Sequence, residues 1–227
     1  MAFSKIINDS HSDNYIVGSQ VYILGDFSNK EMNELIGNLG DYILSLPAHP
    51  IYKASTNITT PYEIKKIKNP IIDFFIDSCG GAENALQNIS ALLNIAKSRG
   101  AIIRTTVLSR AYSAGSLLAI QGTPGFRIMA HDARHMIHYG STGLTAKNPD
   151  DISIMAKQIA AQKEVIMGKY QTYTKIPKSK LNTLMHCESG FLNAPECLKM
   201  KICDWILQDS GNIINLKALQ SQEQKQK

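Results

Sequence analysis

The sequence predicts an α/β protein. Short apolar segments alternate along the chain with longer segments of helical period, the order expected when helices join parallel strands. Most of the apolar segments are continuous rather than alternating, as in strands that are buried on both faces. With 227 residues, 44% of them hydrophobic, the chain is long enough to bury one core.

Four apolar segments and a fifth with a weaker pattern are the expected strands. They are Val21–Leu24, Ile71–Ile76, Ile102–Leu108, Met136–Tyr139 and, with the weaker pattern, Phe126–Met129. Their length and their bounding polar or glycine residues favour strands over short buried helices.

Helices are expected between these strands. Apolar residues recur every three or four positions in Lys30–Leu46 and Glu83–Ser98, and the second pattern stops at Gly100, a suitable helix end. The longest helix should begin at Asp150 or Asp151, either of which can cap it, and run to about Thr174. Two shorter helices are expected at Leu117–Ile120 and Pro195–Met200.

The ends of the chain and one internal segment differ from this pattern. Residues 1–18 and 209–227 are largely polar, and we interpret them as a flexible N-terminal segment and a polar C-terminal tail around a domain at 19–208. Residues 47–69 contain three prolines and a basic run, which predicts a long surface insertion.

Charge argues against a nucleic-acid partner. The net charge is +5, and the small basic clusters Lys65–Lys68 and Lys175–Lys180 lack the interleaved aromatic side chains of a stacking surface. We expect no nucleic-acid and no membrane partner, because no apolar run is long enough to cross a bilayer.

The four cysteines form no CxxC pair, and no signal peptide is recognisable, so we expect reduced thiols and a cytoplasmic protein. A zinc site built from His186, Cys187 and Cys197 lacks ligand-pair spacing and is disfavoured. We expect no metal and no cofactor.

Three local features are suited to acyl-transfer chemistry. Cys79-Gly80-Gly81 follows an expected strand and precedes a helix, so its backbone N–H groups can stabilise an oxyanion or simply form a tight turn. Ser113 lies at a strand-to-helix transition between small residues, where it is either a nucleophile or a helix cap. His138 lies at the end of an expected strand and is a candidate base, although His131 and His135 are close in sequence.

The order of these features resembles the Clp proteolytic-subunit family of the crotonase-like superfamily. The family's S-P-G-G pattern is similar to Ser78-Cys79-Gly80-Gly81, and its G-x-A-A-S-M-G is similar to Ser109-Arg110-Ala111-Tyr112-Ser113-Ala114-Gly115. Its G-x-R and I-H-Q-P patterns are similar to Gly125-Phe126-Arg127 and Ile137-His138-Tyr139-Gly140. Its F-x-S-A-x-E-A resembles Phe191–Cys197, so the likeness runs from about Val21 to Leu207.

The resemblance implies a crotonase-like fold of repeated β-β-α units, with the helix at 150–174 as a protruding handle. It implies a serine peptidase with Ser113 as nucleophile, His138 as base, and the backbone N–H groups of Gly81 and Ala114 as the oxyanion hole. It also implies heptameric rings that stack into a tetradecamer, with other subunits of the same type and an AAA+ unfoldase as partners.

The third member of the catalytic triad departs from the family pattern. The family's aspartate position is Ser189 here, whereas Glu188 lies one residue earlier and Gly190 resembles a single-residue insertion that realigns it. A glutamate can hold the imidazole if its extra methylene is accommodated. We therefore take Glu188 as the expected third member, the alternative being an exposed loop glutamate.

Two other functions stay open on the sequence. One is a catalytically silent ring subunit, which the missing aspartate favours. The other is a crotonase-type acyl-CoA enzyme, in which Gly80 and Gly81 would bind a thioester oxygen. The chain lacks the GxxxxGK[ST] pattern, so any use of ATP would fall to a partner.

Overall fold

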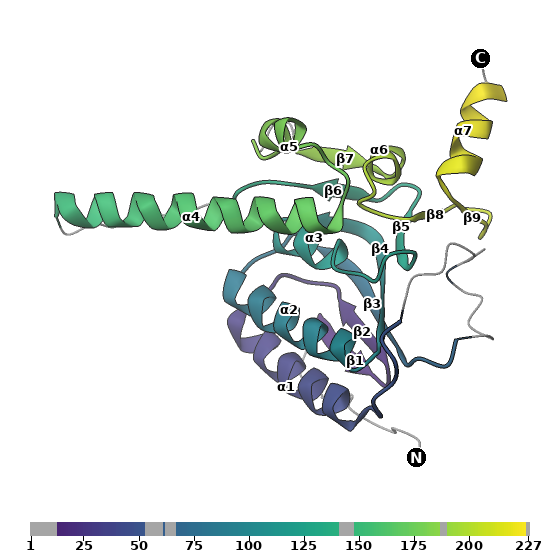
Figure 1. The fold of residues 1–227 in the computed structure, drawn as a ribbon, viewed down its shortest axis with the longest axis horizontal. Helices are drawn as coiled ribbons and strands as arrows, with labels where there is room; N and C mark the ends of the chain where they lie inside the picture. Colours follow the sequence, from purple (N-terminus) through teal and green to yellow (C-terminus); the bar gives the residue numbers. More distant parts are fainter. Residues whose placement is uncertain (1–12, 53–60, 62–66, 141–147, 187–189, 226–227) are drawn as a thin grey trace.

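The structure is a computed structural model that describes residues 13–52, 61, 67–140, 148–186 and 190–225 (Figure 1). The nine strands of these residues form one mixed sheet. They are β1 (Asn14–Val17), β2 (Gln20–Ile23), β3 (Ile71–Ser78), β4 (Ile102–Tyr112), β5 (Arg127–Ala130), β6 (Arg134–Met136), β7 (Phe191–Asn193), β8 (Trp205–Leu207) and β9 (Ile213–Ile214). The helices are α1 (Asn29–Ser45), α2 (Glu83–Ser98), α3 (Ala114–Ala119), α4 (Pro149–Tyr173), α5 (Lys178–Leu184), α6 (Ala194–Lys199) and α7 (Leu216–Lys225). The α/β prediction is confirmed.

The sheet is parallel in its centre and divides where β4 ends. β2, β3, β4, β5 and β8 run parallel, with β1 and β9 antiparallel at the edges. The middle of β4, at Thr105–Val107, pairs with β5, whereas its last residues, Arg110–Tyr112, pair with β6. The register between β3 and β4 also shifts after Ile76. The strand end that leads into α3 is therefore displaced from the main sheet.

Apolar spacing in α1 and α2 explains the core on one face of the sheet. Met32, Leu35 and Leu39 of α1 are buried, and so are the α2 residues Leu86 and Ile89, at the three- and four-residue spacing of one helix face. Figure 1 shows these two helices side by side against the sheet. Burying each such side chain contributes roughly 1.5–3 kcal/mol.

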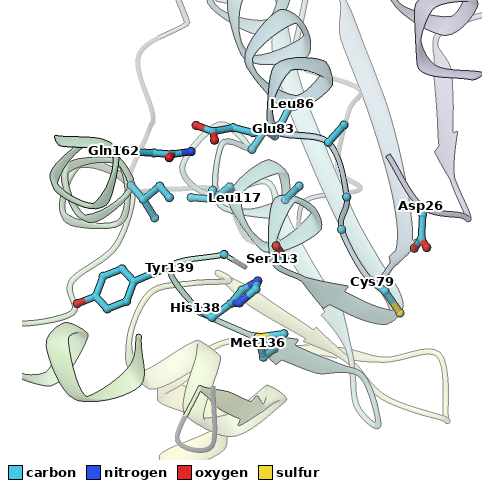
Figure 2. Close-up of a pocket in the computed structure, with 16 residues that line it drawn as sticks. Asp26, Cys79, Glu83, Leu86, Ser113, Leu117, Met136, His138, Tyr139 and Gln162 are labelled. Atoms are coloured by element: carbon cyan, nitrogen blue, oxygen red, sulfur yellow. The ribbon is translucent and has the colours of Figure 1, made fainter. Parts of the chain in front are cut away.

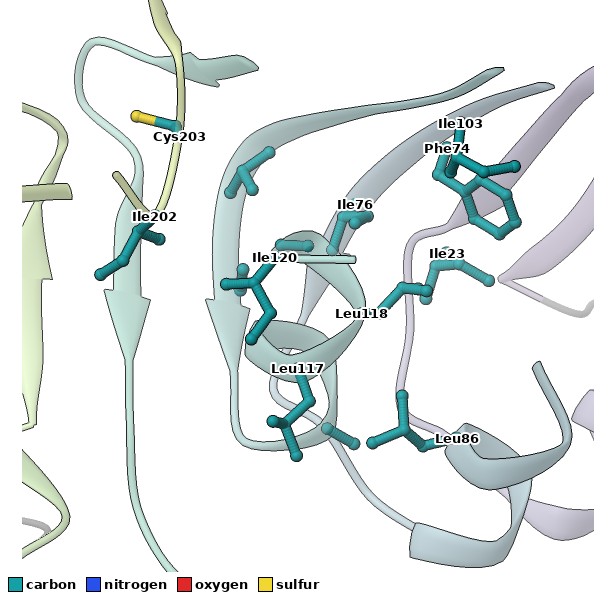
Figure 3. Packing of buried hydrophobic residues seen from close by; sticks show 14 of the residues in the cluster. Ile23, Phe74, Ile76, Leu86, Ile103, Leu117, Leu118, Ile120, Ile202 and Cys203 are labelled. Carbon is teal, nitrogen blue, oxygen red and sulfur yellow. The ribbon is translucent and has the colours of Figure 1, made fainter. Parts of the chain in front are cut away.

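The short helix α3 packs within the same core. Leu117 and Leu118 of α3 are buried together with Phe74 and Ile76 of β3 and with Leu86 of α2 (Figure 3). A buried ion pair links the first residue of β5 to the residue that precedes β8, because the Arg127 guanidinium donates to the Asp204 carboxylate at 2.8 Å. The G-x-R pattern thus has a structural role.

The long helix α4 begins earlier than expected. Its N-cap is Asn148, whose Oδ1 accepts the Asp151 N–H at 2.8 Å, and not Asp150 or Asp151. Only its last turns enter the core, through Ile166, Met167 and Tyr170. The remainder projects from the body of the molecule (Figure 1) and exposes the apolar residues Ile152, Ile154 and Val165.

Several sequence-based boundaries were wrong. The strand expected at Met136–Tyr139 is β6 at Arg134–Met136, so His138 lies after the strand and not within it. Asn14–Val17, expected to be flexible, form β1 and pair with β2. The segment 209–227, expected to be a polar tail, contains strand β9 and helix α7, with Leu219 buried. Residues 1–12 lie outside the described part of the chain.

The described parts of the 47–69 segment contact the domain. The Tyr52 ring packs edge-on against buried Phe126, with ring centroids 5.6 Å apart. The Asn69 amide donates to the carbonyl oxygens of Pro50 at 2.9 Å and Gly100 at 2.7 Å. None of the described helices is long and apolar enough to cross a membrane.

Candidate active site

Two glycines after β3 are held by a backbone bridge from Phe27. The Phe27 N–H donates to the Gly80 carbonyl, and the Ala82 N–H donates to the Phe27 carbonyl, both at 2.7 Å. Gly80 and Gly81 have φ values of 101° and 132°, which favour glycine. A Cβ atom on Gly81 would lie 2.7 Å from the Phe27 oxygen. The bridge fixes the Gly81 peptide. The Gly81 N–H itself donates to none of the backbone acceptors in the described part of the chain.

Ser113 occupies a strained turn between β4 and α3. Its φ of 53° lies in the left-handed region that non-glycine residues rarely adopt. The turn is held by the neighbouring strand β6, because the Ser113 N–H donates to the Met136 carbonyl at 3.1 Å. Ala114 is the first residue of α3, so its N–H has no intrahelical acceptor. A strained strand-to-helix turn of this kind places the Ser113 hydroxyl beside a backbone N–H group that has no acceptor within the helix.

Ser113 and His138 line the same cavity. The cavity has a volume of about 540 Å³, and Gly81 and Ala114 also line it. Figure 2 shows the His138 imidazole directed toward the Ser113 hydroxyl. The structure therefore brings together four of the five residues that the sequence analysis selected.

Burial lowers the pKa of His138 below its ordinary value of 6.5, because a charged imidazolium is poorly solvated there. A lowered pKa keeps the ring neutral near pH 7, the form that accepts a proton. The other two candidate bases do not line the cavity. His131 is exposed beside Asp132, and His135 is fully buried.

The buried His135 belongs to a polar network that the sequence did not indicate. Its Nε2 lies 2.6 Å from the Ser116 hydroxyl, which also forms a hydrogen bond with the Tyr170 hydroxyl. All three residues are buried. Burial lowers the pKa of His135 to about 3, so this ring stays neutral. The network ties α3, one turn beyond Ser113, to β6 and to the buried end of α4.

The candidate third member, Glu188, lies outside the described residues, but Gly190, two residues further along the chain, is described. The Ile137 N–H donates to the Gly190 carbonyl at 3.0 Å, and a Cβ atom on Gly190 would lie 2.0 Å from the Ile137 oxygen. Gly190 therefore packs directly against the backbone that precedes His138. A side chain there would push the two segments apart, which explains why glycine is required.

Of the three cysteines that the structure describes, only Cys79 lines this cavity. Cys79 is an exposed free thiol that lines the cavity, whereas Cys197 is free and buried. The disfavoured zinc site is not tested, because Cys187 lies outside the described residues. Among the described residues, one group could hold a metal ion, formed by the exposed side chains of His131, Asp132 and Asp209.

Comparison with known proteins identifies the family. The family model for Clp protease matches residues 62–210. The chain is 30% identical over 105 residues to an ATP-dependent Clp protease proteolytic subunit from Deinococcus radiodurans, which covers 46% of this chain and 50% of that protein. It is 27% identical over 140 residues to proteolytic subunit 1 from Bifidobacterium longum, covering 62% of this chain and 58% of that protein. The match to proteolytic subunit 3 from a Synechococcus strain is 27% identical over 186 residues and covers 80% of each chain.

This chain therefore aligns with 50% and 58% of the length of the first two relatives and with 80% of the third. The family model covers more than half of the present chain and includes Gly81, Ser113 and His138. The mainly parallel sheet and its helices agree with that assignment. This chain belongs to the Clp protease family.

Proposed function

We propose that this chain is a serine endopeptidase subunit that cleaves peptide bonds of unfolded polypeptides through an acyl-enzyme. The main support is the strained turn that presents Ser113 to His138 in one cavity, next to the N–H groups of Gly81 and Ala114. A nucleophile, a neutral base and two backbone donors are the groups that acyl transfer requires.

In the proposed mechanism, His138 accepts the Ser113 proton while Ser113 Oγ bonds to the substrate carbonyl carbon. The carbonyl oxygen becomes an oxyanion that accepts hydrogen bonds from the Gly81 and Ala114 N–H groups. The imidazolium then gives its proton to the departing amine as the carbon–nitrogen bond breaks. A water molecule, deprotonated by His138, attacks the ester, and the proton returns to Ser113 as the acid product leaves.

We assign Glu188 to orient the imidazole and to stabilise the imidazolium. The contact of Gly190 with Ile137 supports this assignment, because it holds the chain two residues beyond Glu188 against the residue that precedes His138. Ser189 stands where the resemblance implies an aspartate, and this favours a second candidate function, a catalytically silent ring subunit.

For the assembly, we propose heptameric rings that stack into a tetradecamer, with other Clp-type subunits as further partners. The projecting α4 supports this proposal, because its exposed Ile152, Ile154 and Val165 offer apolar surface to a neighbouring subunit. Folded substrates would need a separate AAA+ unfoldase. We place the protein in the cytoplasm, where free thiols such as those of Cys197 and Cys203 persist.

Hydrolysis of a short fluorogenic peptide by the purified protein tests the function. We expect cleavage by the wild type and its loss in Ser113→Ala, with sedimentation confirming that both form the same assembly. Absence of cleavage by the assembled wild type would favour the silent subunit. Rapid degradation of a folded protein by this chain alone would contradict the need for an unfoldase.

A further inference from the structure

The lining of the cavity that contains Ser113 has two acidic side chains, although the protein as a whole is basic. Two of its lining residues, Asp26 and Glu83, carry carboxylates, and none of the described residues that line it is a lysine or arginine. The whole chain has a net charge of +5. Lining carboxylates without a lysine or arginine beside them in the lining favour a cationic group in the ligand.

Glu83 is fixed at the wall of the cavity. It is the first residue of α2 and lies two positions after Gly81, whose N–H belongs to the proposed oxyanion hole. Its side chain is half-buried, and its Oε1 accepts a hydrogen bond from the Gln87 side chain at 3.0 Å. In Figure 2, Glu83 lies on the side of Gln162, and Asp26 lies beyond Ser113 beside Cys79.

No internal cation neutralises Glu83 by direct contact in the described part of the chain. The six ion pairs found there within 4.0 Å do not include Glu83. Lys169 of α4 interacts with Glu83 electrostatically, but burial is the larger effect and lowers the pKa of Lys169. The Gln87 hydrogen bond uses Oε1 of Glu83, so Oε2 is the oxygen that a ligand would approach.

The walls beside Glu83 suit the stem of a long basic side chain. Leu86, Leu117 and Ile166 line the same cavity and present apolar surface. Lysine and arginine pack their methylene groups along such surface and place the charge at a carboxylate beyond it. A neutral apolar side chain would fill the same walls but would desolvate the carboxylate and give it no hydrogen bond in return.

We propose that Glu83 makes this cavity selective for peptides with a lysine or arginine beside the bond that Ser113 attacks. The inference rests on the proposed function for its substrate class, but peptide binding tests it without catalysis. Asp26 is exposed, so solvent screens it and its contribution is smaller.

The test is binding of two fluorescein-labelled peptides to the Ser113→Ala protein, measured by anisotropy. The peptides differ in one central residue, lysine or norleucine, which have similar stems and differ in charge. We expect the lysine peptide to bind about tenfold more tightly, the order of one hydrogen bond to a charged group. Adding Glu83→Gln should remove that preference, and Asp26→Asn should reduce it less.

Glu223→Gln, which removes an exposed carboxylate of α7 outside the cavity, is the matched control and should leave the preference unchanged. Equal binding of the two peptides, no binding of either, or a preference that survives Glu83→Gln would overturn the inference. Hydrolysis by the wild type separates the two proposals. Cleavage of both peptides at equal rates would reject the selectivity alone, whereas selective binding without cleavage would reject the peptidase alone.

Discussion

A Cβ atom on Gly80 would lie 2.6 Å from the Cβ atom of Ser113. The same atom would lie 2.8 Å from the Tyr112 carbonyl oxygen and 2.9 Å from the Ala114 nitrogen. The proposed nucleophile, Ser113, and one proposed oxyanion donor, Ala114, thus pack against the bare backbone of Gly80. Its φ of 101° also disfavours any side chain.

Gly80→Ala should therefore displace the Ser113 turn and lower kcat for peptide hydrolysis about a hundredfold, the scale expected for a misplacement of about 1 Å. The matched control is Gly37→Ala in α1, where a Cβ atom would meet nothing within 4 Å. That variant should keep full activity. A Gly80→Ala protein that is folded and equally active would show that the packing does not position Ser113.

The pH dependence of kcat/KM should reflect the lowered pKa of His138. Burial favours the neutral ring, so the proton-accepting form persists below pH 6.5 and is lost only as pH falls through the lowered pKa. We expect kcat/KM to be level from pH 8 to about 6.5 and to fall at lower pH. A midpoint above pH 6.5 would mean that a negative neighbour, for which Glu188 is the candidate, outweighs desolvation at His138.

Glu188→Gln should lower kcat about a thousandfold if Glu188 completes the triad, because an amide neither holds the imidazole in the same way nor stabilises its charge. KM should change little. Glu223→Gln again serves as the control for loss of one exposed carboxylate. Unchanged kcat in Glu188→Gln would remove Glu188 from the site and leave a Ser113–His138 dyad.

His135 should make the protein sensitive to acid. Its folded pKa of about 3 lies below its unfolded value of 6.5, so the unfolded chain gains a proton first as pH falls. Protonation of His135 therefore leaves the free energy of unfolding unchanged above pH 6.5. It lowers that free energy progressively toward pH 3, by about 1.4 kcal/mol per pH unit. Urea unfolding of His135→Gln should show a shallower loss of free energy of unfolding between pH 6.5 and 4.5 than the wild type.

His131→Gln is the control for that experiment, because His131 is exposed and lies beside Asp132. Its unfolding free energy should follow the wild type across the same pH range. If His135→Gln and the wild type lose stability in parallel, His135 is not the group that couples folding to protonation.

The parts of the fold that the sequence predicted best are those with strong local patterns. The bounds of α2 were predicted as observed, because its buried positions follow one helical face and Gly100 ends the pattern. In contrast, α7 has a polar sequence in which only Leu219 is buried, so no periodic signal marks it. The strand at β6 was predicted too far along the chain, because Ile137 is buried like a strand residue but does not pair with a neighbouring strand.

The candidate site shows the same division. Gly81, Ser113 and His138 were found because local turns and a recognisable order of motifs carry them. Phe27 gave no signal, because it acts through its backbone on glycines more than fifty residues away. The contact between Ser116 and Tyr170 likewise joins residues 54 positions apart, which only the packing of α4 brings together.

Labelling with a fluorophosphonate, which bonds covalently to an activated serine hydroxyl, tests the central claim most directly. The labelled residue would be located by mass spectrometry in the assembled wild type and in His138→Ala. We predict a single modified serine, Ser113, in the wild type and loss of the label in His138→Ala. An assembled protein that takes no label at Ser113 would contradict the claim that Ser113 and His138 form a working nucleophile and base.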